Sequence, residues 1–446
     1  MASKKTNWLC CQLGAREHYA IPRALLRQQM LGWLVTDAWV PPSSFVAKRS
    51  GSRLTDRFHN ELRDAPVVAF NSSLILFEMF ARMRRLQEWE TIIARNRWFQ
   101  RKVVSLLQSQ LRKGAWPPRS FALPTIDSEK KRGSHGTLGS RPILLSYSYA
   151  AREPFRYAKS REWKTVLVQI DPGPEEERIV AEEVARVPEL VGEWQPAPAE
   201  YWASWREECH LADAIVVNSE WSREGLVRSG VPREKIAVIA LAYETPDAGC
   251  RQSAAFAEAL AAKEVGAARL YPARFTRERP MRVLFLGQVN LRKGIARLLE
   301  AAKILRDEPV EFWMVGPVQI PNAEAVANNA RVKWLGSVTR NQAAENYKAA
   351  DVFILPTLSD GFAITQLEAQ AFGLPVISSK LCGGVVESGL NGIILEEPSV
   401  ACIAATVRDC IADPDRLQKL AAASHVRDEF TIDALAQRLR ELGAIL

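Results

Sequence analysis

Two carboxylates, Asp360 and Glu368, stand eight positions apart and bracket a glycine-containing loop that runs into an apolar helical segment. Backbone amides at the start of a helix, together with the positive end of its dipole, suit a diphosphate. Carboxylates on either side of the loop suit the hydroxyl-rich rings of sugars. The types and spacing of these residues therefore predict a nucleotide-sugar site.

The same stretch also allows a purely structural interpretation. Thr365 and Glu368 have the Ser/Thr-x-x-Glu spacing of a capping box, which closes the first turn of a helix, and Asp360 would then be an ordinary loop carboxylate. Short motifs of this kind match by chance at a high rate. The motif alone leaves both interpretations open.

The segments around the motif predict a parallel sheet with helices on both faces. Residues 351–357 are expected to form a buried strand leading into the loop, and residues 373–377 a turn and a strand leading out of it. From residue 281 onward, short runs rich in β-branched and aromatic residues alternate with helical patterns, one of which covers residues 295–305. The expected strands are 283–286, 310–315, 332–335, 352–355, 376–378 and 393–395.

The N-terminal half has the same character with longer insertions. Its expected strands are 8–11, 67–70, 143–147, 165–170, 214–218 and 235–240, and a helix is expected over 175–186, directly after Pro174. At 446 residues the chain exceeds the size of one ordinary core, so two domains are expected. We place the connection between them within residues 247–280.

The composition argues against a membrane-spanning, secreted or metal-binding protein. No apolar run approaches the roughly 18 residues of a membrane span, and the basic N-terminus lacks the uninterrupted apolar core of a signal peptide. Seven cysteines without a Cys-x-x-Cys pair argue against a disulfide framework and a zinc ribbon, and five histidines offer little to a structural metal. These features indicate a cytoplasmic protein without a bound metal.

A net charge of +8 and a pI near 9.1 fit nucleic acids, anionic membranes or phosphorylated substrates equally well. No stacking platform or helix-turn-helix signature accompanies the charge, so a nucleic-acid partner is not expected. A basic cluster in the N-terminal half is by default a solvated helix face, and peripheral contact with an anionic membrane is the sharper alternative. Its members are Arg82, Arg84, Arg85, Arg95, Arg97, Arg101 and Lys102.

The order of the C-terminal segments and the residues within them resemble family 4 of the retaining glycosyltransferases. The family signature is Glu-Gly-Phe-Gly, four further residues and Glu, followed by a helix of small residues and Gly-Leu-Pro-Val. Here Asp360 stands for the first Glu and Ala363 for the second Gly, and residues 373–376 read Gly-Leu-Pro-Val. The resemblance covers residues 211–446 well and residues 1–210 loosely. It implies a GT-B fold, with two Rossmann-like parallel-sheet domains facing each other across a cleft.

The resemblance also assigns roles on the donor side. Arg292, Lys293 and the amides of Ile364 and Thr365 would bind the donor diphosphate, without a metal ion or other cofactor. Asp360 with Gly361, Phe362 and Ala363 would hold the transferred hexose, and Glu368 with Trp334 would contact the ribose and base. Lys293, Asp360 and Glu368 are the expected catalytic group. Gln288 occupies the family's usual arginine position, so whether Arg292 replaces that cation stays open.

The first half departs further from the family. Gln169 stands at the end of an expected strand where the family often has histidine, and it cannot titrate. The family's early Gly-Gly loop appears as the single Gly14. With Asp171, these residues are the expected acceptor side. The implied domains are 1–275 for the acceptor, 276–430 for the nucleotide sugar, and a final helix over 431–446, for which packing back on the first domain is one option.

The resemblance implies transfer of a hexose, with retention, from a nucleotide diphosphate sugar to a hydroxyl of a glycan, a lipid-linked saccharide or a small molecule. Two other functions fit the same features. A nucleotide-sugar epimerase would release free sugar without an acceptor, and a non-catalytic binder or partner subunit would show nucleotide affinity without turnover. The sequence leaves the donor base, the sugar and the acceptor undetermined.

Overall fold

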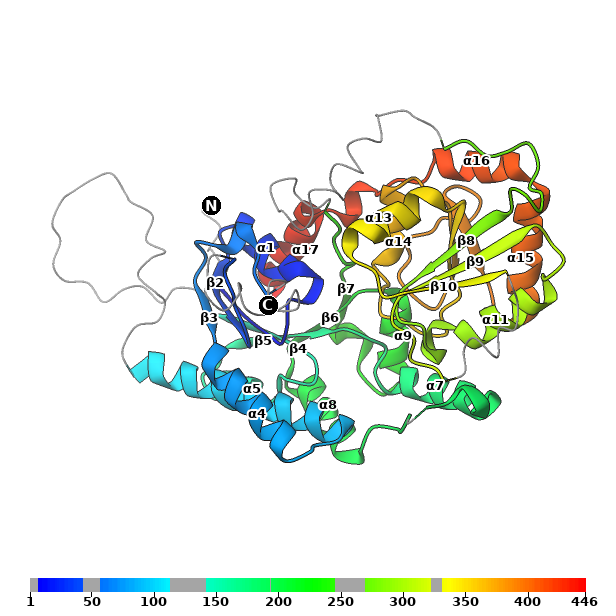
Figure 1. Ribbon diagram of the computed structural model, residues 1–446. Coiled ribbons are helices and arrows are strands. Elements are labelled where there is room, and N and C mark those ends of the chain that lie inside the picture. Colours follow the sequence, from blue (N-terminus) through cyan, green and yellow to red (C-terminus); the bar gives the residue numbers. More distant parts are fainter. Residues whose placement is uncertain (1–6, 43–56, 113–141, 193, 245–268, 322–330) are drawn as a thin grey trace, which may run out of the picture.

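A computed structural model describes residues 7–42, 57–112, 142–192, 194–244, 269–321 and 331–446 (Figure 1). Two parallel sheets organise the chain, and each is covered by helices. The first sheet has seven strands in the order β3-β2-β1-β4-β5-β6-β7, and the second has six in the order β10-β9-β8-β11-β12-β13. The expected fold class, two α/β domains with parallel sheets, is confirmed.

The strands of the first sheet are largely apolar, and all but the two edge strands are buried on both faces. They are β1 (Trp8–Gln12), β2 (Leu31–Thr36), β3 (Val67–Ala69), β4 (Ile143–Tyr147), β5 (Lys164–Gln169), β6 (Ala214–Val217) and β7 (Ile236–Val238). Six of them match expected strands to within a few residues. Strand β2 was not expected, because Gly32 interrupts its apolar run; a side chain at this position would collide with Asn7 and the backbone of Trp8.

The second sheet agrees with every strand expected for it. Its strands are β8 (Met281–Leu286), β9 (Val310–Val315), β10 (Val332–Gly336), β11 (Val352–Leu355), β12 (Val376–Ser379) and β13 (Gly392–Leu395). Its helices are α11 (Ile295–Ile304), α13 (Arg340–Ala349), α14 (Thr365–Ala371), α15 (Val400–Ala412) and α16 (Pro414–Ala422). The expected helix over 295–305 is therefore confirmed as α11, whose buried face includes Leu298 and Leu299.

Helices surround the first sheet on both sides. They are α1 (Ala20–Arg27), α4 (Asn71–Met83), α5 (Glu88–Arg112), α6 (Arg152–Lys159), α7 (Pro174–Arg186), α8 (Ala199–Leu211) and α9 (Glu220–Arg228). Pro174 is the first residue of α7, as expected for a position whose amide needs no partner inside the helix. None of the helices in the described parts of the chain combines the length and the apolar character of a bilayer-spanning segment.

The last helix, α17 (Ile432–Ile445), returns to the first domain and packs against α1 (Figure 1). Its Leu435, Leu439 and Leu442 enter the same buried cluster as Trp8 of β1. The chain thus crosses from the first domain to the second and back again. The expected connection within residues 247–280 falls largely on residues 245–268, outside the described part, and the domain boundaries at 275 and 430 stay predictions.

A charged network joins the two domains. Glu183 on α7 is 1% exposed and accepts hydrogen bonds from Arg186 on its own helix and from Arg297 on α11. Arg186 also reaches Glu300 of the second domain at 2.8 Å. Burial alone would raise the pKa of Glu183, but the two guanidinium groups outweigh it and lower that pKa. The ion pairs hold α7 against the second domain.

The loop from β11 to α14 contains a strained alanine. Ala363 has φ of +62°, a left-handed conformation that L-residues other than glycine adopt only at a cost of about 1–2 kcal/mol. Its neighbour Phe362 is buried and its following residues enter α14 directly, so the chain has no room to relax. The position where the sequence has Ala in place of the family's Gly is thus one where the backbone favours Gly.

Replacing Ala363 by glycine is expected to stabilise the protein by about 1 kcal/mol, since the positive φ then carries no steric penalty. Ala343 in the interior of α13 is the matched control, and Ala343→Gly should destabilise by a similar amount. Urea denaturation of both variants measures the difference. Destabilisation by Ala363→Gly as large as that of the control would contradict the strain.

Candidate active site

Two cations converge on Asp360 where the β11–α14 loop meets the first domain. Lys293 Nζ forms an ion pair with Asp360 Oδ2, and Arg292 reaches the same oxygen at 3.3 Å. Both cations belong to the 3₁₀ turn η6 (Leu291–Lys293), whose Asn290 caps it through the amide of Lys293. The predicted diphosphate cations and the first predicted carboxylate therefore lie together.

Backbone bonds fix this cluster in place. The carbonyl of Arg292 accepts from the amide of Leu358 at 2.9 Å and from Thr357 Oγ1 at 3.1 Å. Asp360 Oδ1 accepts from the amide of Phe362 at 3.0 Å. Burial would raise the pKa of Asp360, but Lys293 and Arg292 lower it to about 2. Asp360 is therefore ionised at neutral pH and holds both cations in position.

The loop is seated on the first domain at Gly361. A Cβ at this position would lie 2.0 Å from the carbonyl oxygen of Ile170, at the end of β5, so only glycine fits. Ser222 Oγ, near the start of α9, donates to the carbonyl of Gly361 at 3.4 Å. Gly361, predicted to contact the hexose, thus also lies in close contact with the first domain.

A further carboxylate, Glu176 on α7, completes the junction. Its Oε2 accepts from Ser359 Oγ at 3.0 Å and lies 3.7 Å from Arg292. Burial, with the nearby Asp171 and Asp360 carboxylates, raises the pKa of Glu176 to about 7 against the opposing effect of Arg292. Glu176 was not among the predicted site residues, because its signal in the sequence is only a place among three consecutive glutamates after a helix-starting proline.

Glu368, the second predicted carboxylate, lies in the first turn of α14. The helix begins after Ile364, and no side chain caps it, so the capping-box interpretation of Thr365 and Glu368 is wrong. Glu368 Oε2 instead accepts a hydrogen bond of 2.9 Å from the buried hydroxyl of Tyr347 on α13. Burial raises the pKa of Glu368 against the effects of Tyr347 and Arg340. The side chain of Glu368 is thus held by Tyr347 and does not cap the helix.

The amides of Ile364 and Thr365, predicted to bind phosphate, make no hydrogen bond to any described group in this structure. Trp334, predicted beside the base, is half-buried on β10 and packs against the core of the second domain.

On α13, Arg340 contacts His18 of the first domain. Burial is the main cause that lowers the pKa of His18 to about 3, and the charge of Arg340 is the second. The contact therefore joins a guanidinium to a neutral imidazole.

The residues predicted for the acceptor side are used within the first domain. Gly14, with φ of +82°, donates its amide to Asp37 at 2.9 Å. Gln169 is fully buried, donates to Asp171 at 2.8 Å and accepts from Trp205 at 2.9 Å. The side chains of Gln169 and Asp171 are thus held within the first domain. A role of these residues in acceptor binding stays a prediction.

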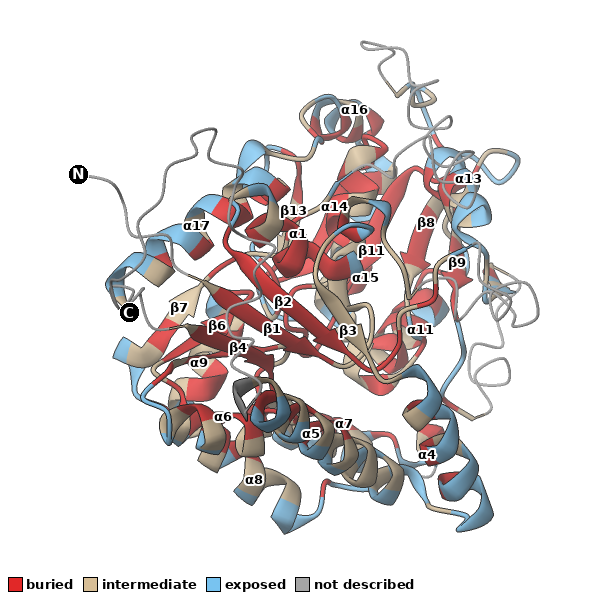
Figure 2. Cartoon of the chain, turned by 90° about the vertical axis from the view of Figure 1, so that its left-hand side faces the viewer, coloured by how far each residue is buried: buried red, intermediate tan, exposed pale blue. Residues whose placement is uncertain are grey.

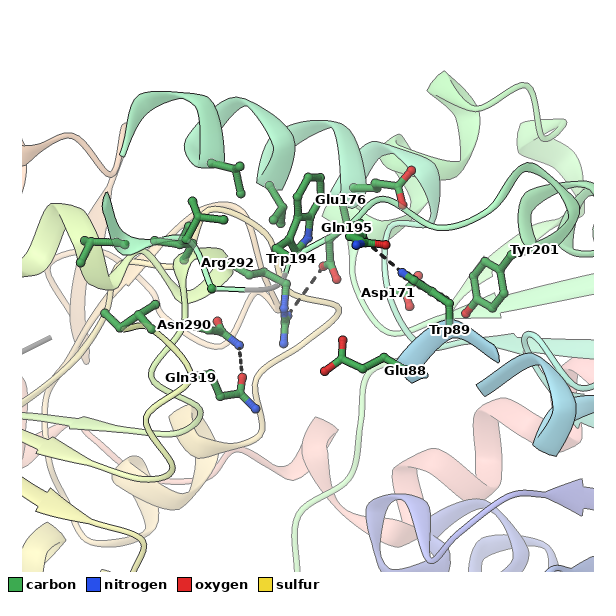
Figure 3. Close-up of a pocket in the computed structure, with 18 of the residues that line it drawn as sticks. Glu88, Trp89, Asp171, Glu176, Trp194, Gln195, Tyr201, Asn290, Arg292 and Gln319 are labelled. Atoms are coloured by element: carbon green, nitrogen blue, oxygen red, sulfur yellow. Dashed lines mark hydrogen bonds and ion pairs between the residues drawn. The ribbon is translucent and has the colours of Figure 1, made fainter. Parts of the chain in front are cut away.

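Next to Arg292 and Glu176 lies a cavity of about 710 Å³ between the domains (Figure 3). Aromatic side chains form much of its wall: Trp89, Tyr149, Trp194, Tyr201 and Trp202. Its carboxylates are Glu88, Asp171, Glu176 and Glu177, against the single guanidinium of Arg292. Tyr149 and Tyr201 stack at 4.7 Å, and Tyr149 donates to Asp171 at 2.6 Å. No motif in the sequence predicts this wall, because its residues come from α5, α7, α8 and the second domain.

No group of three or more potential ligand side chains suited to a metal ion occurs within the described ranges. The six cysteines among them are free thiols, and Cys250 lies outside them.

The raised pKa of Glu176 predicts a pH dependence of stability. The unfolded chain releases this proton near pH 4.5 and the folded protein near pH 7, so the folded state binds more protons in between. Stability is therefore expected to fall by up to about 3 kcal/mol as pH rises through this window. Glu176→Gln should flatten that slope, measured as unfolding free energy from pH 4.5 to 7.5. Glu182→Gln, on the exposed face of α7, is the control, and an identical slope in Glu176→Gln would contradict the assignment.

Known proteins resemble the second domain in sequence and the whole chain in fold. Residues 280–413 match the family model described as glycosyl transferases group 1. D-inositol 3-phosphate glycosyltransferase of Xylanimonas cellulosilytica is 31% identical over 153 residues, which cover 32% of this chain and 36% of that protein. The enzyme of the same name from Rhodococcus opacus is 29% identical over 179 residues, or 35% and 40% of the two chains. The matches span about two fifths of these relatives' length.

Solved structures extend the likeness to the first domain. Anabaena Alr3699/HepE in complex with UDP superposes with a TM-score of 0.57 at 15% identity, over 99% of this chain and 100% of that one. Sucrose-phosphate synthase from Thermosynechococcus elongatus has the same TM-score at 16% identity, with 98% of each chain covered. At such identity these two structures show the fold alone. Residues 280–413 thus match the glycosyl transferases group 1 model, and the chain as a whole has a GT-B fold.

Proposed function

We propose that the protein is a retaining glycosyltransferase that moves a hexose from a nucleoside diphosphate sugar to a hydroxyl group of an acceptor. The observation that carries the proposal is the convergence of Arg292 and Lys293 on Asp360 at the junction of the two domains. Two cations held this close to one buried carboxylate supply a ready site for the oxygens of a diphosphate.

Negative charge develops on the leaving diphosphate during transfer, and groups already aimed at it lower the barrier. Lys293 and Arg292 would stabilise that charge together with the unpaired amides of Ile364 and Thr365. No metal ion enters this scheme. Asp360 and the loop through Ala363 would hold the hexose, and Glu368 would accept hydrogen bonds from the ribose. The structure of HepE in complex with UDP and glucose supports this choice of donor class.

The front-face route fits these residues best. In this route the departing phosphate takes the proton of the acceptor hydroxyl, and both events occur on one face of the sugar. Asp360 is bound by two cations, so its charge is committed to them rather than free for attack on the anomeric carbon. Retention then needs no covalent intermediate on the protein.

The cavity beside Arg292 is the proposed acceptor site. Its aromatic faces suit the apolar faces of sugar rings, and its carboxylates suit their hydroxyl groups. Glu88, Asp171 and Glu177, with Glu176 partly ionised near neutral pH, outnumber the single guanidinium and would repel a phosphorylated acceptor. We therefore propose a neutral, hydroxyl-rich acceptor, in contrast to the phosphorylated inositol in the names of the relatives above.

Transfer is tested by incubating the protein with a panel of nucleotide sugars and neutral oligosaccharides and measuring nucleoside diphosphate release. Release should rise with acceptor, persist in EDTA, and give a product with the donor's anomeric configuration. Lys293→Met should abolish it, whereas Lys303→Met, on the exposed end of α11, should not. Binding of a donor without turnover would support a non-catalytic binder, and free sugar released equally without acceptor would support an epimerase.

Glu368→Gln is expected to lower donor-dependent kcat/KM about ten- to a hundredfold. The variant loses a charge-assisted hydrogen bond to the ribose, typically worth roughly 1.5–3 kcal/mol. Its amide oxygen can still accept from Tyr347, so the melting temperature should change little. Glu345→Gln on the exposed face of α13 serves as the control. A folded Glu368→Gln protein with parental nucleotide affinity would remove this residue from the donor site.

A further inference from the structure

Helix α4 (Asn71–Met83) is apolar on two opposite faces. Its inner face packs Leu74, Phe77 and Ala81 into a small core, where Phe77 stacks on Trp98 at 5.5 Å. Its outer face carries five large apolar side chains in solvent, namely Ile75 (55% exposed), Leu76 (67%), Met79 (62%), Phe80 (44%) and Met83 (76%). Because the inner face already satisfies the core, the outer apolar face has no role in folding.

The outer side chains form one continuous strip. Positions 75, 79 and 83 are four apart along the helix, as are 76 and 80, so these residues lie side by side. Figure 2 shows α4 at the edge of the molecule with a long exposed side. Monomeric proteins rarely expose a contiguous apolar patch of this kind unless it binds something.

Arginines border the strip. Arg82, Arg84 and Arg85 are exposed, and no described carboxylate pairs with any of them. Arg84 lies over the ring of Phe80 at 4.9 Å, so cation and apolar strip are in contact. The one acidic residue of α4, Glu78, lies 3.9 Å from Arg95 on α5. The strip is therefore apolar in the middle and cationic at its C-terminal end.

Fewer residues of the predicted basic cluster carry free charge in the structure than the sequence suggests. Arg95 forms an ion pair with the fully buried Asp37 at 2.9 Å, and Arg97 pairs with Glu200 at 2.7 Å. These two arginines serve the first domain itself. The exposed charge next to the apolar strip comes from Arg82, Arg84 and Arg85.

We propose that α4 docks the first domain on the surface of an anionic bilayer. The strip would enter the boundary between headgroups and acyl chains, and the three arginines would contact lipid phosphates, as in interfacial amphipathic helices. The charge pattern favours a lipid surface. Three arginines without a described carboxylate partner stand at one end of the apolar strip, and this arrangement matches anionic headgroups above an apolar layer.

The position of α4 links docking to the cavity described above. Three residues after Arg85, α5 begins with Glu88 and Trp89, and both side chains line the cavity. A membrane held by α4 would therefore lie close to that cavity and favour an acceptor presented at the lipid surface. This last step rests on the proposed function, whereas docking itself does not.

Flotation of the whole protein with vesicles tests the proposal without any nucleotide, so its outcome is independent of transfer activity. Vesicles of phosphatidylcholine with 30% phosphatidylglycerol should bind the protein, and pure phosphatidylcholine should bind it much less. Each arginine near the surface contributes about 1 kcal/mol, or roughly fivefold in partitioning. The Arg82→Gln, Arg84→Gln, Arg85→Gln triple variant should therefore bind about a hundredfold more weakly.

Leu76→Ser with Met79→Ser tests the apolar strip. Both side chains are exposed, so this double variant should keep its melting temperature and lose vesicle binding at least tenfold. Leu390→Ser, 53% exposed on the second domain, is the matched control and should bind as the parent does. Equal binding of the parent to neutral and anionic vesicles, or parental binding by the double variant, would overturn the proposal. Concentration-dependent self-association abolished by the same double variant, without vesicle binding, would replace the membrane by a second copy of the chain.

Discussion

The contact between the β11–α14 loop and the first domain is the constraint on which the rest of the structure depends. Gly361 approaches the carbonyl of Ile170 so closely that a single methyl group would separate the domains. The residue before it, Asp360, is buried, and Lys293 and Arg292 compensate its charge. One short loop therefore determines both how the domains meet and where the cations of the site lie.

The charges at this junction bear on the proposed diphosphate site. Asp360 and Glu176 both lie near Nη1 of Arg292, and Asp360 also binds Lys293. Breaking a buried ion pair by removing one partner costs several kcal/mol, so the cations stay in place while no ligand is bound. A phosphate that enters can share them with Asp360, whose own position is fixed by the amide of Phe362. In the proposed function, the cations would thus be in place before a donor binds.

Much of this arrangement follows from the sequence alone. Parallel strands end at the same edge of a sheet, so the turn after β8 and the loop after β11 had to lie near each other, and with them Lys293 and Asp360. The strand runs themselves are strongly apolar and were found in both halves, apart from β2. The role of Glu368 in the first turn of α14 was left open between ligand and cap, and the bond from Tyr347 settles only that it is no cap.

What the sequence could not supply depends on contacts between distant segments. The cavity wall joins Trp89, Tyr201 and Arg292 from three separate parts of the chain. The burial of Gln169 depends on Trp205, and the pairing of Arg95 depends on Asp37, neither of which is marked by spacing. For α4, apolar residues all round the helix indicate burial on both sides, and only the structure shows that one side faces solvent.

The central claim is that the cations on Asp360 form a diphosphate site, and calorimetry of nucleotide binding tests it most directly. A nucleoside diphosphate and the corresponding nucleoside share the base and ribose, so their difference isolates the phosphate contacts. We predict that the diphosphate binds at least a hundredfold more tightly and that Lys293→Met removes most of this difference while leaving nucleoside binding unchanged. Equal affinities for the two ligands, or an undiminished difference in Lys293→Met, would contradict the claim.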